Sequence, residues 1–261
     1  GDYFLNDAFS CSHRAHASTD AITRFLPSFF GPMMNEEINA LHEALENPKK
    51  PSLAIIGGSK VSTKISVLKN LVCKLDNLII GGGMANTFLY AGGSPIGKSL
   101  YEPDFKDTVN EIHELAKKYD CKIFLPVDVV VSKNLIKNAY HKIVNINDCP
   151  SDHMILDIGE KSIELYKRII SSSKTILWNG PLGAFETKPF DEGTNALAKH
   201  TSLITVNKKC VSVAGGGDTV SALNSINVTA DFSYISSAGG AFLEWLEGKE
   251  LPGIKAINLS K

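Results

Sequence analysis

Apolar runs that end in glycines constrain the fold more than any other feature of this sequence. The clearest run covers residues 211–214 and leads into Gly215-Gly216-Gly217-Asp218-Thr219, after which a helical pattern starts. Similar runs end at Gly57-Gly58, Gly81-Gly82-Gly83, Asn179-Gly180 and Gly239-Gly240. A strand that ends in glycines and opens a helix lets bare backbone approach a phosphate and points the helix N-terminus at it. The repeated pattern indicates that one edge of a sheet holds a polyanion.

The order of these elements predicts an α/β fold. Runs typical of buried strands lie near residues 53–56, 78–80, 123–125, 155–158, 175–178, 211–214 and 233–235. Helical patterns lie at residues 59–73, 84–91, 103–119, 160–170, 191–199, 218–224 and 240–247. Strands that alternate with helices predict a three-layer Rossmann-like domain, with a mostly parallel sheet and helices on both faces. Ligands of such sheets bind outside the carboxyl ends of the strands, where the glycines fall.

The first 32 residues follow a different pattern. Residues 3–9 predict one strand and its exit loop, and residues 25–32 form a connector interrupted by prolines. A helical pattern follows over residues 33–45. Because one strand cannot form a sheet, we expect residues 1–32 to be a remnant of another domain.

If residues 1–32 are a remnant of another domain, the two ends of the chain should lack part of their packing partners. Without the rest of that domain, the segments 3–9 and 251–261 should expose apolar side chains. Phe4, Phe9 and Leu251 are the side chains that we expect to be exposed.

The composition limits the possible partners. The 261-residue chain is 43% hydrophobic with a formal net charge of −1, which argues against broad binding to nucleic acid or acidic membranes. No apolar run approaches the roughly 20 residues of a membrane helix, and no signal peptide is visible. The five cysteines form no Cys-x-x-Cys pair. This favours reduced thiols and a cytoplasmic location over disulfides or a zinc site.

The sequence contains neither of two common nucleotide-binding motifs in the context that each requires. Residues 92–99 match G-x-x-x-x-G-K-[ST], but they follow a helical stretch and contain Pro95. A P-loop follows a strand and opens a helix, so these residues predict an ordinary loop. No G-x-G-x-x-G opens any helix, which argues against a dinucleotide dehydrogenase.

Charged side chains beside the glycines suggest a phosphate site. Lys60 and Lys64 are four residues apart at the start of a predicted helix, so they should share one face at its positive end. A bound anion explains them better than two solvated lysines do. Asp218 is either an ordinary first-turn acid or the ligand of a divalent cation that bridges to phosphates. Arg14, between His13 and His16, fits a carboxylate or phosphate binder, with a capping or surface role as the alternative.

Taken in order, several strings resemble the phosphoglycerate kinase family over essentially the whole chain. They are Asn6-Asp7-Ala8-Phe9, His13-Arg14-Ala15-His16, Gly57-Gly58-Ser59-Lys60, Gly81-Gly82-Gly83-Met84-Ala85, Trp178-Asn179-Gly180-Pro181, Gly215-Gly216-Gly217-Asp218-Thr219 and Leu246-Glu247-Gly248-Lys249-Glu250-Leu251-Pro252-Gly253. The resemblance implies that residues 1–32 are the end of an N-terminal domain that binds 3-phosphoglycerate. Residues 33–250 would be the nucleotide-binding domain, including an interdomain helix at 33–46. Residues 251–261 would be a tail that returns to the N-terminal domain.

The resemblance also implies the reaction, in which ATP and 3-phosphoglycerate interconvert with ADP and 1,3-bisphosphoglycerate. The partners would be ATP or ADP and 3-phosphoglycerate, the cofactor Mg²⁺, and the protein a monomer. Because transfer needs two domains that close around the substrates, we expect this chain to bind Mg–nucleotide but to be poorly active alone. The alternative hypothesis is a stand-alone nucleotide-binding module or regulator without kinase activity.

Residue roles follow from the same resemblance. The implied nucleotide site consists of Gly58, Ser59, Lys60, Lys64, Gly82, Asn179, Pro181, Glu186, Gly216, Gly217, Asp218 and Thr219. In it, Lys60 would meet the transferring phosphoryl group, Lys64 the nucleotide phosphates and Glu186 the ribose, while Asp218 would hold the Mg²⁺. Gly239 and Gly240 would offer amides to the moving phosphoryl group. His13 and Arg14 would be what this chain retains of the 3-phosphoglycerate site, with Arg14 also taking part in catalysis.

Overall fold

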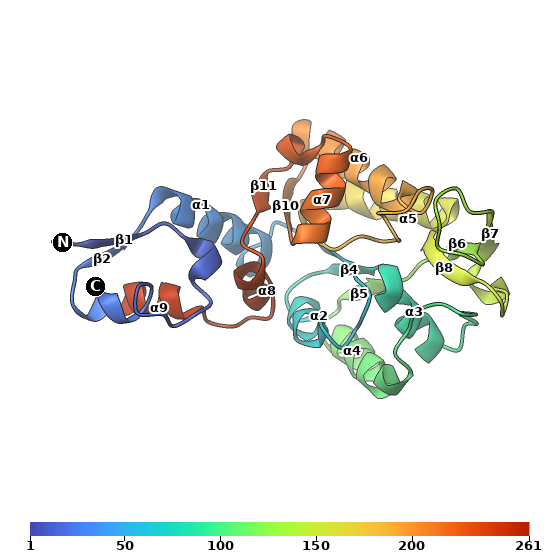
Figure 1. Ribbon diagram of the computed structural model, residues 1–261, viewed down its shortest axis with the longest axis horizontal. Coiled ribbons are helices and arrows are strands. Elements are labelled where there is room, and N and C mark those ends of the chain that lie inside the picture. The colour runs from blue at the N-terminus through green and yellow to red at the C-terminus, as the bar shows by residue number, and fades with distance from the viewer. Residues whose placement is uncertain (261) are drawn as a thin grey trace.

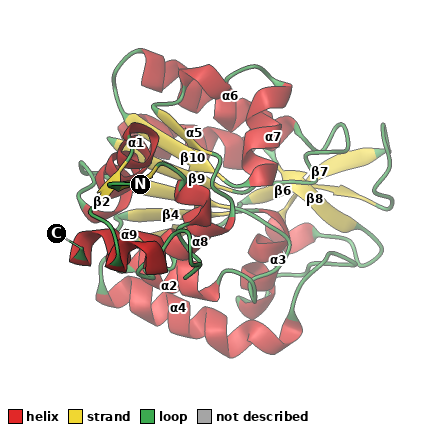
Figure 2. Cartoon of the chain, turned by 60° about the vertical axis from the view of Figure 1, so that its left-hand side comes forward, coloured by secondary structure: helices red, strands yellow, loops and turns green. Residues whose placement is uncertain are grey.

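A six-stranded parallel sheet forms the centre of the protein. The computed structural model describes residues 1–260, and the strands of this sheet lie in the order β11-β10-β9-β3-β4-β5. They are β3 (Ser52–Ile56), β4 (Asn77–Ile80), β5 (Lys122–Phe124), β9 (Thr175–Asn179), β10 (Val211–Gly215) and β11 (Tyr234–Ser236). All neighbouring strands run parallel. The predicted α/β fold with a mostly parallel sheet is confirmed (Figures 1 and 2).

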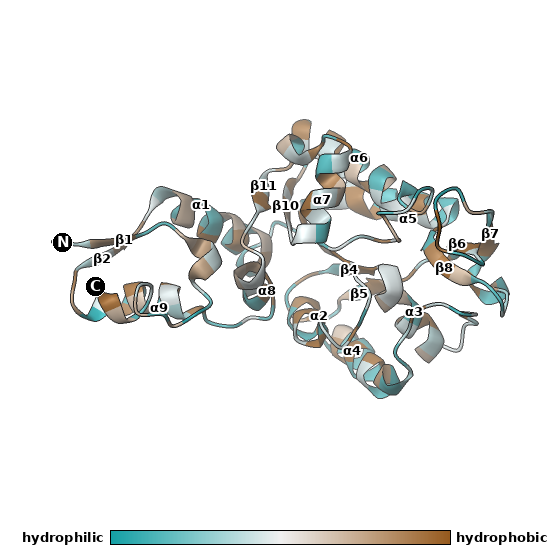
Figure 3. Ribbon diagram, in the orientation of Figure 1, coloured by the Kyte–Doolittle hydropathy of each residue, from teal (hydrophilic) through white to brown (hydrophobic). Residues whose placement is uncertain are grey.

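Helices cover both faces of this sheet and complete the three layers. The helices α1 (Pro32–Leu41), α2 (Ile65–Val72), α3 (Gly82–Ala91), α4 (Lys106–Lys118) and α8 (Gly240–Leu246) share one hydrophobic core with alternate strand residues such as Ala54 and Ile56. The intervening residues Leu53 and Ile55 face a second core. That core is shared with α5 (Glu160–Ser172), α6 (Glu192–Val206) and α7 (Gly217–Ser225). Figure 3 shows both polar and apolar residues on α4 and α5, as expected for helices that cover a sheet.

A second, antiparallel sheet corrects one expectation. The strands β6 (Asp128–Ser132), β7 (His141–Asn145) and β8 (Met154–Ile158) pair in the order β7-β6-β8. Residues 155–158 therefore do not join the parallel sheet. Their sequence pattern did not distinguish the two sheets, because β8 is an apolar strand whose last three residues are buried. The strand β7, which pairs with β6, is mostly exposed and lacks the apolar run that marks a buried strand.

The segment between β3 and α2 is a turn, not the start of a helix. The predicted helix over 59–73 begins only at Ile65. The Glu102 carboxylate accepts hydrogen bonds from the backbone N–H and the hydroxyl of Ser62, at 2.9 and 2.6 Å. These bonds hold the turn in a loop conformation. The prediction that Lys60 and Lys64 share one face of a helix is therefore wrong.

The two chain ends pack together, which corrects a second expectation. The strand β1 (Phe4–Asn6) pairs in parallel with β2 (Ser28–Phe30), so it is not a lone strand. The helix α9 (Pro252–Leu259) contacts β2, and the N–H of Gly253 donates to the carbonyl of Ser12 at 2.9 Å. Figure 1 shows this small unit at one end of the molecule, with both termini in it.

The predicted exposure of apolar side chains in these segments is wrong for two of the three residues. Phe9 is 4% exposed and Leu251 2% exposed, because both belong to the first hydrophobic core. Phe9 also packs on Trp245, with ring centroids 6.0 Å apart. Phe4 is partly buried. Other apolar side chains of this unit are exposed instead, namely Tyr3, Leu5, Phe25, Phe29 and Met33.

None of the helices within residues 1–260 combines the length and the hydropathy that crossing a bilayer requires.

Candidate active site

A cavity of about 390 Å³ opens at the carboxyl ends of the parallel strands. The sheet order reverses between β3 and β9, and the loops that follow these two strands and β4 contribute to its lining. A topological switch point of this kind is where open α/β sheets bind their ligands, and the volume is within the range of small-molecule sites. The fold therefore places this cavity where the glycine-ended strands converge.

Several positions in these loops require glycine, because another backbone segment lies too close to leave room for a Cβ atom. A Cβ atom on Gly57 would collide with the carbonyl of Pro181, and one on Gly180 with the carbonyl of Gly57. Gly180 also has a φ of +104°, which favours glycine. By contrast, a Cβ atom on Gly217 or Gly239 would meet nothing within 4 Å. Only the second kind of glycine leaves open space in which a ligand can approach the backbone.

Lys64 lies between the ends of β3 and β9. Its Nζ donates to the carbonyl of Gly57 at 2.7 Å and to Oδ1 of Asn179 at 2.6 Å. Desolvation lowers the pKa of Lys64 to about 8, although the nearby Asp218 carboxylate opposes the shift. A largely buried ammonium with a reduced pKa, beside a cavity, is typical of an anion site.

Asn179 and Thr219 join the ends of adjacent strands. The Asn179 Nδ2 donates to the carbonyl of Gly215 at 2.7 Å, and the Thr219 hydroxyl accepts from the N–H of Gly180, also at 2.7 Å. Both side chains are at most 3% exposed. A Cβ atom on Gly216 would lie 2.5 Å from the Asn179 Nδ2. These residues therefore position the loops, with their polar groups already paired inside the protein.

Two exposed charged side chains lie in the segments that border the cavity. Asp218, in the first turn of α7, lines it, and Lys60 follows the lining residue Ser59 in the loop after β3. Within residues 1–260, neither side chain has a hydrogen bond or an ion pair. The same part of the chain contains no group of three or more His, Cys, Asp or Glu residues that would hold a metal by itself. A single free carboxylate suits Mg²⁺, which proteins bind through one or two carboxylates together with substrate phosphates.

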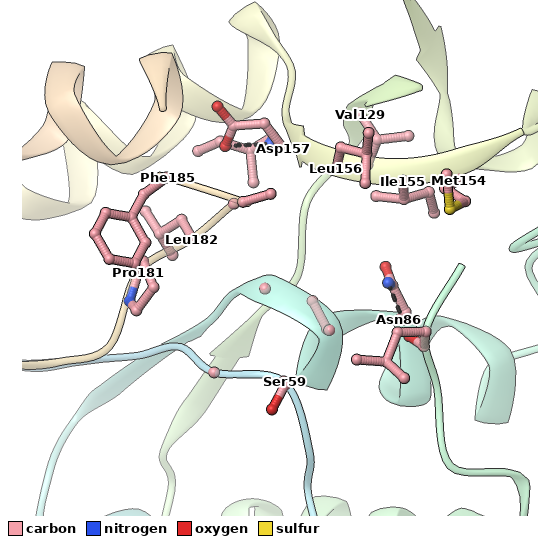
Figure 4. A pocket seen from close by; sticks show the side chains of 18 of the residues that line it. Ser59, Asn86, Val129, Met154, Ile155, Leu156, Asp157, Pro181, Leu182 and Phe185 are labelled. Atoms are coloured by element: carbon pink, nitrogen blue, oxygen red, sulfur yellow. Dashed lines mark hydrogen bonds between the residues drawn. The ribbon is translucent and has the colours of Figure 1, made fainter. Parts of the chain in front are cut away.

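The interior of the cavity is apolar, and the sequence did not indicate it. Leu100, Met154, Ile155, Leu156, Leu182 and Phe185 line it, as Figure 4 shows for most of them. They come from β8 and from loops, where no periodic pattern distinguishes a ligand contact from ordinary core.

Asp157 also lines the cavity, and the sequence pattern did not indicate this position either. It is 2% exposed, and burial raises its pKa to about 8. Both carboxylate oxygens accept backbone hydrogen bonds at 2.8 Å, from Ile158 and from Gly193 in the first turn of α6. The carboxyl group thus anchors β8 to a helix.

The structure brings most of the predicted nucleotide-site residues to one place. Gly58, Ser59, Gly82, Pro181, Glu186 and Asp218 line the cavity. Lys64, Asn179, Gly216 and Thr219 lie directly behind it through the contacts described above. Gly217 adjoins Asp218 at the start of α7, and Lys60 adjoins Ser59.

The remaining predicted residues do not line this cavity. Gly239 and Gly240 stand at the start of α8, where a Cβ atom on Gly240 would lie 3.1 Å from Nε2 of His13. The structure thus brings His13 and Gly240 together from opposite ends of the chain. Arg14, next to His13, is exposed.

Comparisons with known proteins match nearly the whole chain to one family. The family model "Phosphoglycerate kinase" matches residues 1–249. Phosphoglycerate kinases from Methylorubrum extorquens and Zymomonas mobilis are 55% and 54% identical over 257 residues, or 98% of this chain. The chain spans 64% and 65% of the length of these two relatives.

Solved structures give the same result. The phosphoglycerate kinase of Coxiella burnetii is 45% identical with a TM-score of 0.95, and that of Pyrococcus horikoshii is 30% identical with a TM-score of 0.82. Each comparison covers 99% of this chain and 66% or 64% of the solved chain. The chain belongs to the phosphoglycerate kinase family.

Proposed function

We propose that this chain supplies the nucleotide-binding part of a phosphoglycerate kinase. The reaction is reversible phosphoryl transfer between ATP and the carboxylate of 3-phosphoglycerate, which gives ADP and 1,3-bisphosphoglycerate. The supporting observation is that Asp218 lines the cavity, with the open backbone of Gly217 next to it and the buried Lys64 directly behind it. These groups provide a buried cation, a free carboxylate and a helix N-terminus, which together suit a metal-bound polyphosphate.

The proposed chemistry needs positioning and charge stabilisation. The attacking carboxylate is already ionised at neutral pH, so no residue has to remove a proton from it. As the bond from the γ-phosphorus to the oxygen of ADP breaks, a bond from that phosphorus to the carboxylate oxygen forms. In this proposal Lys60 approaches the transferring phosphoryl group and Lys64 stabilises the nucleotide phosphates. Asp218 would hold the Mg²⁺, which, when bound, neutralises phosphate charge.

The apolar interior and its rim suit the rest of the nucleotide. The base would enter between the loop of Gly82 and the wall formed by Met154 and Leu156. Glu186 is exposed at the rim and would accept hydrogen bonds from the ribose hydroxyls. Asn179, Thr219 and Gly216 would position the loops that carry Lys64 and Asp218.

The second substrate would be held by residues outside the cavity. We propose that residues 1–32 and 251–261 belong to the domain that binds 3-phosphoglycerate, and that residues 33–250 form the nucleotide domain. The contact between α9 and β2 supports the first grouping. His13 and Arg14 would contribute to the 3-phosphoglycerate site, and Gly239 and Gly240 would offer amides to the moving phosphoryl group. The protein would act as a monomer in the cytoplasm.

Separate titrations of the purified 261-residue chain test this proposal. By isothermal calorimetry we expect Mg–ADP to bind, and 3-phosphoglycerate to bind weakly or not at all. A coupled assay should give little turnover, because the chain spans about 64% of the length of its relatives. Failure of Mg–ADP to bind would refute the nucleotide site, and turnover close to that of a whole relative would refute the division of substrates. The alternative of a stand-alone module has no observation in its favour.

A further inference from the structure

Asn86 on α3 has an unsatisfied acceptor in the wall of the cavity. The side chain lines the cavity and is 2% exposed. Its Oδ1 is sealed from solvent and has no hydrogen-bond partner among residues 1–260. A buried amide oxygen without a partner is uncommon, because the lost hydration is normally replaced by another hydrogen bond.

The orientation of the Asn86 amide is determined by the hydrogen bond of its Nδ2 group. The Asn86 Nδ2 donates to the carbonyl oxygen of Leu100 at 3.1 Å. Turning the amide over would place Oδ1 against that carbonyl oxygen, so the acceptor has to point away from Leu100. Figure 4 shows it pointing toward the opposite wall, which carries Met154 and Ile155.

The surroundings leave few other polar groups for a ligand in this part of the cavity. Leu100, Met154, Ile155 and Leu156 are apolar, and the buried Asp157 already accepts a hydrogen bond on each oxygen. A ligand with an N–H group at this depth would therefore find its partner in the Asn86 Oδ1. It would displace no water from that oxygen, so only the N–H group of the ligand would exchange its hydration for this bond.

We propose that Asn86 is a specificity-determining residue, whose Oδ1 accepts a hydrogen bond from an amino group on the base of the nucleotide. The site thereby selects bases that carry such a donor. This inference rests on the proposed function, since it requires the base to lie in the apolar interior. Entry of the amino group needs a small movement of the opposite wall, and the flexible side chain of Met154 allows it.

Calorimetry with two nucleotides tests the inference. The probes are Mg–ADP and the Mg complex of purine riboside 5′-diphosphate, which lacks the 6-amino group and is otherwise identical. We expect the wild-type chain to bind Mg–ADP about tenfold more tightly. In Asn86→Leu the ratio of the two affinities should fall to about one. Asn86→Leu also removes the hydrogen bond to Leu100, but that loss affects the affinities for both nucleotides equally. The ratio of the two affinities therefore reports on Oδ1 alone.

The control is Leu135→Ala, which changes another residue that lines the cavity, 48% exposed, and should keep the ratio. If Asn86→Leu does not fold, Asn86→Ser replaces it, and the wild-type comparison stands in either case. Equal binding of both probes by the wild type would overturn the role of Asn86 while leaving the nucleotide site intact. An unchanged ratio of affinities in Asn86→Leu, or in Asn86→Ser where that variant replaces it, would likewise overturn the role of Asn86. Failure of both probes to bind would overturn the proposed function as well.

Discussion

Lys64 shows how burial adapts one residue to bind an anion. Three oxygens, the carbonyls of Gly57 and Asn179 and the Asn179 Oδ1, hold its ammonium group, and desolvation lowers its pKa to about 8. The folded pKa is below the ordinary value of 10.5. Between these values the unfolded chain carries more protons than the folded chain, so the contribution of Lys64 to stability increases with pH in that window.

The same shift predicts that nucleotide binding is coupled to proton uptake. At about pH 9 much of the free protein has a neutral Lys64, and bound phosphates should raise its pKa and draw in a proton. Calorimetry of Mg–ADP binding in two buffers with different ionisation enthalpies measures this uptake. Lys64→Met should abolish it, whereas Lys69→Met, which removes an exposed lysine paired with Glu111, should retain it. Heats that do not depend on the buffer in the wild type would contradict the prediction.

Asp218 carries the prediction for the metal. Replacing its exposed carboxylate by an amide in Asp218→Asn should weaken Mg–ADP binding by roughly tenfold or more. Binding of ADP without Mg²⁺ should change little, because the charge that repels phosphate is also lost. Titrations with Mg²⁺ and with a chelator measure both values. The control is Asp107→Asn, because Asp107 is the exposed second residue of α4 just as Asp218 is the second residue of α7. An equal loss with and without Mg²⁺ would argue against a metal ligand.

At the scale of elements, the site depends on how the ends of β9 and β10 are joined. Thr219 and Asn179 each make a buried hydrogen bond from one strand end to the other. Asp128 and Asp157 do the equivalent for the antiparallel sheet. Asp128 accepts from the N–H groups of Lys161 and Ser162 at the start of α5, and Asp157 from Gly193 at the start of α6. Buried polar side chains thus determine how sheets, helices and loops are placed around the cavity.

Thr219→Val tests the connection between β9 and β10. Valine has nearly the same shape, but it leaves the N–H of Gly180 buried without an acceptor. We expect a loss of about 1–3 kcal/mol in the free energy of unfolding, measured by urea denaturation. The control Thr108→Val replaces a partly exposed threonine on α4 whose hydroxyl makes no hydrogen bond within residues 1–260, and it should stay within about 0.5 kcal/mol of the wild type. Equal stability of both variants would contradict the argument.

At the scale of the whole molecule, the two chain ends form one packed unit. The strands β1 and β2 pair in parallel, and α9 packs on β2 and on the short 3-10 helix Ala21–Arg24. Gly253 is part of this contact, because a Cβ atom there would lie 3.1 Å from the Cα of Ser12. Residues separated by about the full length of the chain therefore stabilise one another.

This packing predicts that the two ends open together. Ile257 on α9 is fully buried, and Ile257→Ala should remove about 2–5 kcal/mol of local stability. Hydrogen exchange should then become faster in β1 and β2 as well as in α9. The control Leu259→Ala alters a residue of α9 that is 75% exposed and should leave exchange unchanged. Faster exchange confined to α9 would show that the ends are independent.

Local sequence predicted much of the fold. It succeeded where a pattern of apolar and polar side chains is compatible with only one type of secondary structure. The apolar runs of β3, β9 and β10 are completely or almost completely buried strands, and their glycine ends mark the cavity. The pattern failed where contacts distant in sequence decide the conformation. The loop carrying Lys60 is held by Glu102, 40 residues from Ser62, and no local signal reveals that bond.

The sequence by itself determined the class of the fold, the family and the set of residues at the strand ends, because these follow from residue type and order. Only the tertiary structure decided how these residues divide their roles. Asn179 and Thr219 are paired within the protein, whereas the exposed side chains of Asp218 and Lys60 have no hydrogen bond or ion pair within residues 1–260. It also revealed the apolar interior with the unsatisfied oxygen of Asn86. Burial and hydrogen bonding depend on which distant segments meet, and no residue carries that information alone.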